Sequence, residues 1–258
     1  MKNAILSHLP GDFPWQVQYF DTIDSTNTYA KTLAADGAAH GTVILADHQA
    51  SGRGRMGRSF CSVGGAGIYL SVILRPNCQA TELMHLTCAV AVAACDAVEQ
   101  VCGFRPGIKW INDLIAQGKK LGGILTELSL DPATGLVNYA VVGIGINCRN
   151  QEFPEDIRHI AISAEAVTKK AVDRSKLSAA LISALQKMDK ILLTQKSEIM
   201  ARYKENCITL GQEISLLRGD EKRPCRALDL NIDGALQVIY ADGTMEFVNS
   251  GEVSVRTR

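Results

Sequence analysis

The stretch KLGGILTELSLDPATGLVNYAVVGIGIN, residues 120–147, determines the fold that we expect for this 258-residue chain. Two apolar runs within it, Gly122–Ser129 and Val137–Ile146, predict two strands. The segment between them contains the turn residues of DPATG, so the two strands are predicted to form an antiparallel hairpin. Such a hairpin would bring the KLGG end and the GIGIN end together near one edge of a sheet.

The residue pattern also predicts strands and helices outside this hairpin. The further strands are Gln16–Phe20, Thr42–Ala46, Gly67–Leu74 and Gly107–Lys109. The helices are Ser25–Asp36, which opens with a capping Ser-Thr-Asn cluster, Thr81–Val101 and Arg174–Lys204. This mixture favours an α/β or α+β core with a mixed sheet and flanking helices over a regular βαβ array.

The pattern of the chain changes near Cys207. Short alternating strands follow, with turn residues at 218–221, Asp233-Gly234 and Asp242-Gly243. We therefore expect a small SH3-like β-barrel at the C-terminus, and two domains, residues 1–206 and 207–258. No low-complexity linker separates them, so they are expected to pack firmly.

Charge and composition argue against several classes of protein. Lys plus Arg total 27 and Asp plus Glu total 27, so no net charge is present to attract DNA or an anionic membrane. The first fifteen residues fit neither a secretory signal nor a spanning helix, which predicts a cytoplasmic protein. The eight cysteines form no CxxC pair, so no structural zinc site is expected. Cys88, Cys95 and Cys102 recur every seven residues, and we interpret them as core residues instead of a redox or metal stripe.

The segment GRGRMGR, residues 52–58, carries the clearest functional signal. Glycine permits positive φ angles that turn backbone N–H groups toward a ligand, and each guanidinium offers a planar set of donors that fits a carboxylate or phosphate. The segment is therefore predicted to be an anion-binding loop. Taken alone, it could also be a disordered nucleic-acid contact or a solvated turn, although the anion-binding loop is the favoured interpretation.

Four other segments accompany this loop: DSTN at 24–27, KWINDL at 109–114, KLGGILTE at 120–127 and GIGIN at 143–147. In order and spacing, the five segments resemble the catalytic domain of biotin protein ligases over roughly the first 205 residues. The resemblance implies a class II synthetase-like catalytic domain, and the family also carries an SH3-like C-terminal module. It implies an ATP-dependent, AMP-forming enzyme that activates biotin as biotinyl-5′-AMP and transfers it to a lysine of the biotin carboxyl carrier domain of a biotin-dependent carboxylase.

The resemblance also assigns residues. Arg55 and Lys120 would be catalytic. Biotin would be bound by Ser25, Thr26, Asn27, Gln49, Gly52, Arg53, Gly54, Arg55, Lys120, Gly122 and Gly123. ATP would be bound by Arg53, Arg55, Lys109, Trp110, Asn112, Asp113, Lys120 and Asn147. The carboxylate of Asp113 would hold Mg²⁺, directly or through water.

Several of these residues also have a simpler interpretation. Ser25 and its neighbours can cap the following helix, KWINDL can be an Asn-Asp turn after a strand, and Asn147 can cap a strand end. Lys119 is the alternative to Lys120, and either could be a solvated loop lysine. The chain departs from the family patterns GRGRRGR and KWPNDL at Met56 and Ile111, so any contact made by the third arginine of the first pattern is not carried over.

Other functions are less consistent with these residues. Lipoate or octanoate attachment shares the fold, but a fatty chain favours a long apolar slot over polar DSTN and Gln49. A biotin-sensing repressor would add an N-terminal helix-turn-helix, and only 23 residues precede DSTN. A binding-only module is disfavoured because Lys120 and the arginines are present. Both a monomer and a homodimer are compatible with the sequence.

Overall fold

A mixed seven-stranded sheet forms the larger part of the computed structural model, which describes residues 1–218, 221–249 and 251–255. The sheet order is β1-β2-β3-β7-β6-β5-β4. Its strands are β1 (Gln16–Ile23), β2 (Thr42–Gln49), β3 (Gly67–Leu74), β4 (Gly107–Lys109), β5 (Asp113–Ala116), β6 (Lys119–Leu130) and β7 (Val137–Asn147). Only β1 and β2 pair in parallel among the described strands of this sheet; the other neighbours are antiparallel.

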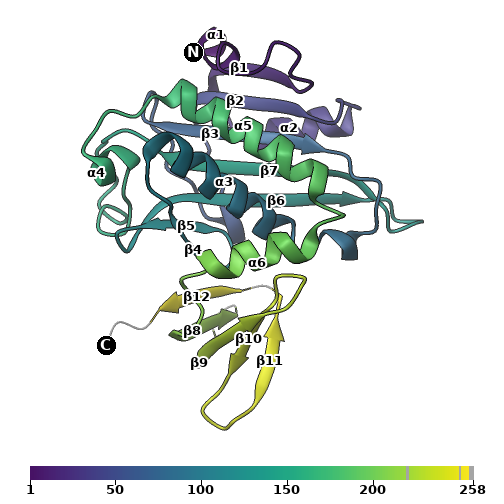
Figure 1. The fold of residues 1–258 in the computed structure, drawn as a ribbon, viewed down its shortest axis with the longest axis vertical. Helices are drawn as coiled ribbons and strands as arrows, with labels where there is room; N and C mark the ends of the chain where they lie inside the picture. The colour runs from purple at the N-terminus through teal and green to yellow at the C-terminus, as the bar shows by residue number, and fades with distance from the viewer. Residues whose placement is uncertain (219–220, 250, 256–258) are drawn as a thin grey trace.

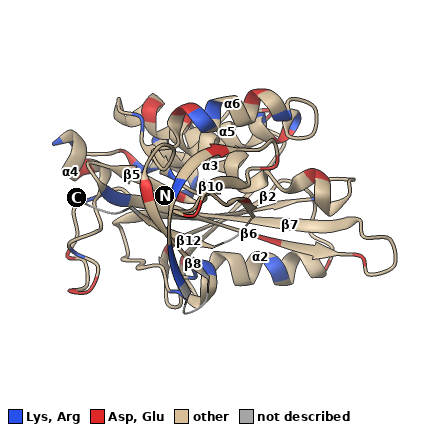
Figure 2. Cartoon of the chain, turned by 90° about the horizontal axis from the view of Figure 1, so that it is seen from below, with Lys and Arg blue, Asp and Glu red and all other residues tan. Residues whose placement is uncertain are grey.

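Helices cover both faces of this sheet (Figures 1 and 2). One face is covered by α3 (Leu86–Cys102), α5 (Arg174–Ile191) and α6 (Lys196–Asn206), and the opposite face by α2 (Thr26–Ala35). Two short helices, α1 (Lys2–Leu6) and α4 (Ala164–Thr168), and two 3₁₀ turns, Arg55–Gly57 and Ala80–Leu83, complete the described helical elements. The predicted mixed sheet with flanking helices is therefore confirmed.

The central strand β3 shows why the sheet sits between two layers. All eight of its residues are buried, and its side chains alternate between the two faces. Leu70 and Val72 pack into the large core with α3, whereas Ile73 packs into a smaller cluster beneath α2. Ser71 shares that second face, so a buried hydroxyl lies close to the start of α2.

The helix α3 is an apolar core helix. The segment Ala80–Cys102 is long and apolar enough to cross a membrane by length and composition alone, but 72% of its most apolar window is buried inside the structure. Cys88 and Cys95 lie in that core, as predicted, and Cys102 is partly buried. Burial raises the pKa of the Cys95 thiol to about 12, so it stays protonated at neutral pH.

The hairpin at 120–147 is confirmed, and two predicted helices are corrected. Strands β6 and β7 pair antiparallel, with Gly123 opposite Gly145. The predicted Thr81–Val101 helix is a 3₁₀ turn followed by α3, and the predicted Arg174–Lys204 helix is α5 and α6 separated by a turn. In both cases the apolar spacing continues across the break, and no glycine or proline marks it.

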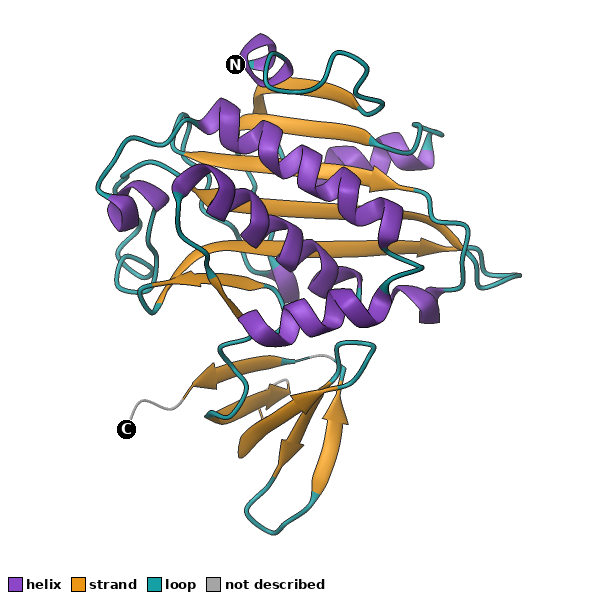
Figure 3. Cartoon of the chain, viewed as in Figure 1, coloured by secondary structure: helices purple, strands orange, loops and turns teal. Residues whose placement is uncertain are grey.

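A second sheet follows α6 and lies beyond it in Figure 3. It consists of β8 (Glu213–Arg218), β9 (Glu221–Leu230), β10 (Leu236–Ile239), β11 (Met245–Val248) and β12 (Glu252–Val255), in the order β11-β10-β9-β8-β12. All of its pairs are antiparallel, in agreement with the predicted SH3-like domain. The predicted turn at 218–221 lies partly outside the described residues, and the boundary at 206/207 stays a prediction.

The two parts are joined by hydrogen bonds around Trp110. Its indole Nε1–H donates to the carbonyl oxygen of Gly234 at 2.9 Å, and its backbone N–H donates to Thr209 Oγ1 at 2.9 Å. The peptide bond between Trp110 and Ile111 is cis. Trp110 is 3% exposed, so these bonds are buried between the large sheet and the small one.

Candidate active site

Two adjoining cavities lie where the predicted motifs meet. The first is lined by Ser25, Thr26, Asn27, Gln49, Arg53, Gly54, Arg55, Phe60, Asn112, Lys120, Gly123, Ile124, Leu125, Gly143, Ile144 and Gly145. The second is lined by Gly54, Arg55, Met56, Arg58, Ser59, Phe60, Lys109, Trp110, Asn112, Asp113, Lys120, Gly251 and Val253. They share Gly54, Arg55, Phe60, Asn112 and Lys120. A ligand in one cavity would therefore reach the same two cations as a ligand in the other.

Buried polar side chains line one end of the first cavity. Ser25 caps α2, and its side chain accepts from the Thr28 N–H. The backbone N–H and hydroxyl of Thr26 donate to Gln49 Oε1 at 2.9 and 3.0 Å, and Gln49 Nε2 donates to Ser62 Oγ at 2.9 Å. The capping and pocket-lining interpretations of this segment are therefore compatible, because one segment does both.

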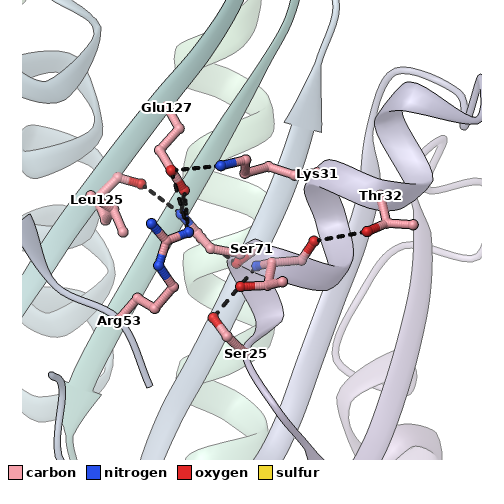
Figure 4. Close-up of polar contacts among 9 residues, drawn as sticks. Ser25, Lys31, Thr32, Arg53, Ser71, Leu125 and Glu127 are labelled. Carbon is pink, nitrogen blue, oxygen red and sulfur yellow. Dashed lines mark hydrogen bonds and ion pairs between the residues drawn. The ribbon is translucent and has the colours of Figure 1, made fainter. Parts of the chain in front are cut away.

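Asn27 is packed against a glycine of β7. A Cβ atom added at Gly143 would lie 2.0 Å from Asn27 Oδ1, which is far inside any normal contact. Ser71 donates to the same oxygen at 2.6 Å, while Asn27 Nδ2 donates to Glu127 Oε2 at 3.0 Å (Figure 4). The first glycine of GIGIN thus provides the space that this amide occupies.

The Arg/Gly loop folds back on itself over the cavities. Gly54 N–H donates to the Arg58 carbonyl at 2.7 Å, and Phe60 N–H donates to the Gly52 carbonyl at 2.8 Å. Positive φ angles occur at Met56 and Gly57, at 55° and 73°, so the expectation of positive φ is met late in the loop. Gly52 instead allows close packing, since a Cβ there would lie 2.4 Å from the Phe60 carbonyl oxygen.

Two cations mark the junction of the cavities. Arg55 Nη1 donates to Asn112 Oδ1 at 3.0 Å, and Lys120 Nζ lies 2.6 Å from Asp113 Oδ1. The Lys120 side chain lies over Gly123, where an added Cβ would be 3.3 Å from Lys120 Cε. Lys119 lines neither cavity.

Some predicted residues lie behind the cavity walls. Gly52 and Gly122 line neither cavity, and a Cβ at Gly122 would lie 2.4 Å from the Gly145 carbonyl oxygen. Asn147 also lines neither, because its amide donates to the Ile162 carbonyl at 3.3 Å and is buried. Arg53 lines the first cavity only.

Other residues at the site were not predicted from the sequence. Phe60 lines both cavities, and a Cβ at Gly145 would lie 2.5 Å from its ring, so this glycine makes room for the aromatic side chain. Gly251 and Val253 of the C-terminal part close the second cavity. The alternating glycines of GIGIN could have indicated that a side chain packs closely against this strand. No local pattern in the sequence indicated that a C-terminal strand approaches the second cavity.

Comparisons with known proteins identify the family. Residues 19–147, half of the chain, match the biotin/lipoate A/B protein ligase family, and residues 209–256 match the biotin protein ligase C-terminal domain. The biotin–[acetyl-CoA-carboxylase] ligase of Mycobacterium tuberculosis is 30% identical over 235 residues, which are 89% of this chain and 85% of that protein. The bifunctional ligase/repressor BirA of Bacillus subtilis is 38% identical over 159 residues, 61% of this chain, and the match spans about half (48%) of its length.

A solved structure shares the whole fold. The biotin protein ligase of Aquifex aeolicus, in complex with biotin and ATP, superposes with a TM-score of 0.79 at 29% identity, over 95% of this chain and 100% of that one. Both halves of the chain thus match the same kind of protein, in sequence and in structure. The chain belongs to the biotin protein ligase family.

Proposed function

We propose that this protein is an ATP-dependent ligase that activates biotin as biotinyl-5′-AMP and transfers it to a lysine of a biotin carboxyl carrier domain. The observation that carries the proposal is the meeting of two cavities at Arg55, Asn112 and Lys120. Joining an acid to an α-phosphate requires two anions to be held close together. One unit charge repels another at 4 Å by about 1 kcal/mol in water and about 4 kcal/mol near a protein surface, so cations are needed between them.

Biotin fits the first cavity in one orientation. Its ureido ring would lie at the end formed by Ser25, Thr26, Asn27 and Gln49, where polar atoms are held in fixed positions. Its carboxylate would then lie near Arg55 and Lys120. Gly54 and Gly123 leave room there for backbone to approach the ligand.

ATP fits the second cavity, with its α-phosphate toward the shared cations. Lys109 and Asn112 line this cavity beside Trp110 and Asp113, and Gly251 and Val253 cover it from the C-terminal part. We infer that the C-terminal part helps to hold the nucleotide. Arg53 and Asn147 do not line this cavity, so their assignment to ATP rests on the family resemblance alone.

Asp113 could supply a single carboxylate ligand to Mg²⁺. Mg²⁺ is commonly held by one or two carboxylates together with substrate phosphates, and Asp113 offers one carboxylate on the wall of the second cavity. It is paired with Lys120 at 2.6 Å, and no group of three or more His, Cys, Asp or Glu side chains suited to a metal occurs among the described residues. The site therefore fits a cation that arrives with the nucleotide, where it would neutralise phosphate charge.

Transfer to the carrier needs no enzyme nucleophile. A mixed anhydride is already activated, so positioning of the acceptor lysine and exclusion of water account for the remaining work. The Arg/Gly loop lies over both cavities and could exclude water in this way. We propose a carrier domain as the macromolecular partner; DNA is not proposed, because the chain has no net charge.

The alternative within the family is lipoate or octanoate attachment. The matching family includes lipoate ligases, so the fold alone does not separate the two activities. The polar lining of the first cavity favours biotin, because a fatty chain is better matched by a long apolar slot than by Thr26, Asn27 and Gln49.

Pyrophosphate exchange into ATP tests the proposal. Purified protein with Mg²⁺ would be given biotin, lipoate or octanoate as the stimulating acid. Biotin alone should drive exchange. Exchange driven by lipoate or octanoate would assign the protein to the sister activity, and no exchange with any of the three acids would contradict adenylation.

A further inference from the structure

Trp110 and Ile111 are hydrogen-bonded by three groups from the last quarter of the chain. The Tyr203 hydroxyl, on α6, donates to the Ile111 carbonyl at 3.1 Å. Thr209 Oγ1 accepts from the Trp110 backbone N–H at 2.9 Å, and the Gly234 carbonyl accepts from the Trp110 indole N–H at 2.9 Å. Tyr203 and Thr209 are both 0% exposed, so these bonds are shielded from solvent.

The Ile111 carbonyl depends on the bond from Tyr203. Isoleucine does not restrict φ as proline would, so the residue type at 111 does not fix the backbone here. Ile111 is 8% exposed, and a buried carbonyl needs a protein donor. Burial raises the pKa of Tyr203 well above its usual value, so the hydroxyl stays protonated and remains a donor. The position of this carbonyl is therefore set by a side chain 92 residues later in the chain.

The next two residues, Asn112 and Asp113, carry groups of the second cavity. Asn112 Nδ2 donates to the Ile124 carbonyl at 3.0 Å, and the Ile124 N–H donates to the Asn112 carbonyl at 3.0 Å. Asp113 Oδ1 lies 2.6 Å from Lys120 Nζ. Residues 110–113 are thus held by contacts from β6 and by contacts from residues beyond 200. Because each planar peptide leaves only two soft angles per residue, a shift at 110–111 would be passed on to Asn112 and Asp113.

The groups that hold residues 110–111 are themselves fixed. Asn231 Oδ1 accepts from two backbone N–H groups of the turn at 231–235, each at 2.9 Å, and so fixes the turn that presents the Gly234 carbonyl. Lys204, next to Tyr203 on α6, lies 2.8 Å from Asp229 of β9. This ion pair links α6 to the small sheet that follows it (Figure 1).

We propose that Tyr203 and Thr209 are positioning residues for the nucleotide side of the site. They hold the backbone at 110–111 and thereby place Asn112 and Asp113 on the wall of the second cavity. Neither Tyr203 nor Thr209 lines either cavity, so both act through the segment 110–113. The naming of ATP as the occupant of the second cavity rests on the proposed function. The placement of the segment does not, since every contact involved lies within the protein.

Hydrogen–deuterium exchange of the ligand-free, full-length protein tests the placement. Tyr203→Phe removes only a hydroxyl, and Thr209→Val replaces a hydroxyl with a methyl group, so both variants keep the packing. Backbone amides in a peptide spanning 107–114 should exchange about three- to tenfold faster in each variant, the range that corresponds to loss of one hydrogen bond. Tyr240→Phe removes a hydroxyl that is bonded to Glu246 within the small sheet, and this matched control should leave the peptide unchanged.

The location of the faster deuterium exchange separates a local effect from a general loss of stability. A peptide spanning 67–74, in the buried strand β3, should keep its protection in both variants. Unchanged deuterium exchange at 107–114 in both variants would overturn the inference. An equal increase at 107–114 and at 67–74 would overturn it as well, because the two side chains would then only stabilise the whole fold.

Pyrophosphate exchange tests the effect on the site. Trp110 and Asp113 line only the second cavity, whereas Asn112 lines both, so a displaced segment should weaken ATP binding more than biotin binding. Tyr203→Phe should raise the KM for ATP about three- to tenfold and leave the KM for biotin within about twofold. An equal rise in both KM values, or reduced stability with both KM values unchanged, would contradict the positioning role.

The inference and the proposed function would fail in different ways. Faster deuterium exchange at 107–114 in a protein that no acid activates would support the role of Tyr203 and Thr209 and contradict the proposed function. Biotin-driven pyrophosphate exchange together with unchanged deuterium exchange in both variants would support the proposed function and overturn this inference alone.

Discussion

The single Cβ atom added by Gly143→Ala should displace the Asn27 amide that lines the first cavity. The added Cβ would lie 2.0 Å from Asn27 Oδ1, 2.7 Å from its Cγ and 3.0 Å from its Nδ2, so the amide must move by about 1 Å to reach even the shortest tolerable contact. That movement breaks the bonds to Ser71 at 2.6 Å and Glu127 at 3.0 Å. At about 1 kcal/mol for each bond, with the overpacking cost in the same range, the free energy of unfolding should fall by about 2–3 kcal/mol. Under the proposed function, the KM for biotin should rise about tenfold, because the amide assigned to biotin recognition is displaced.

Urea unfolding and biotin-dependent pyrophosphate exchange would measure both effects. Gly11→Ala is the matched control, since a Cβ there meets nothing within 4 Å. The sharper comparison adds Gly143→Ala to Asn27→Ala: once the amide is gone, the second change should cost little further stability. If Gly143→Ala were equally destabilising with and without the Asn27 side chain, the clash would not be its cause.

Three further expectations follow from the contacts. Lys120→Met should slow biotin adenylation by about 100-fold or more, since it removes a cation from the junction, while Lys119→Met should leave the rate near normal; equal effects in the exchange assay would contradict the choice of lysine. Trp110→Phe removes the indole N–H bond to Gly234 and should lower the free energy of unfolding by about 1–3 kcal/mol. Nucleotide binding should also weaken. Calorimetry would measure the loss of stability, and a variant as stable as the original would contradict this expectation. Burial would raise the pKa of Glu127, but hydrogen bonds from its neighbours and nearby cations outweigh it and the pKa is lowered. Its stabilising effect is therefore present above its ordinary value of 4.5 and lost as the pH falls below it, so the stability difference between wild type and Glu127→Gln should shrink in unfolding experiments toward pH 4.

The hairpin of β6 and β7 could be predicted because its signals are local. Two apolar runs flank a segment of turn residues, and the pairing follows from chain direction. The break between α5 and α6 could not be predicted in this way. Residues 192–195 contain no glycine or proline, and Lys196 pairs with Asp233 of the C-terminal part, which is distant in sequence. Contacts of that kind are set by tertiary packing, and periodicity does not reveal them.

The same distinction applies to the site. The segments that line the cavities are short and distinctive, so their gathering could be expected from the family resemblance. The residues that fix their side chains are dispersed: Ser71 lies in the middle of a buried apolar strand, and Glu127 looks like an ordinary polar position at the end of KLGGILTE. A buried serine beneath a helix cap has a cost unless it finds a partner, and this is the one hint that the sequence offered. Which partner the buried serine finds depends on which helix covers that face of the sheet.

The two cations at the junction of the cavities, Lys120 and Arg55, are bound to neighbouring side chains by contacts that cost little to break. The Lys120 and Asp113 side chains are 38% and 21% exposed, and an ion pair of this exposure contributes about 0.2–1 kcal/mol, so Lys120 can leave Asp113 for a ligand anion at small cost. Arg55 is held by the neutral amide of Asn112 and keeps its full charge available. A fully buried ion pair at the same place would be far more costly to break, because each charge would be left without a partner in a medium of low dielectric constant. Partial exposure of the Lys120 and Asp113 side chains therefore allows the charges at the junction to change partners at small cost.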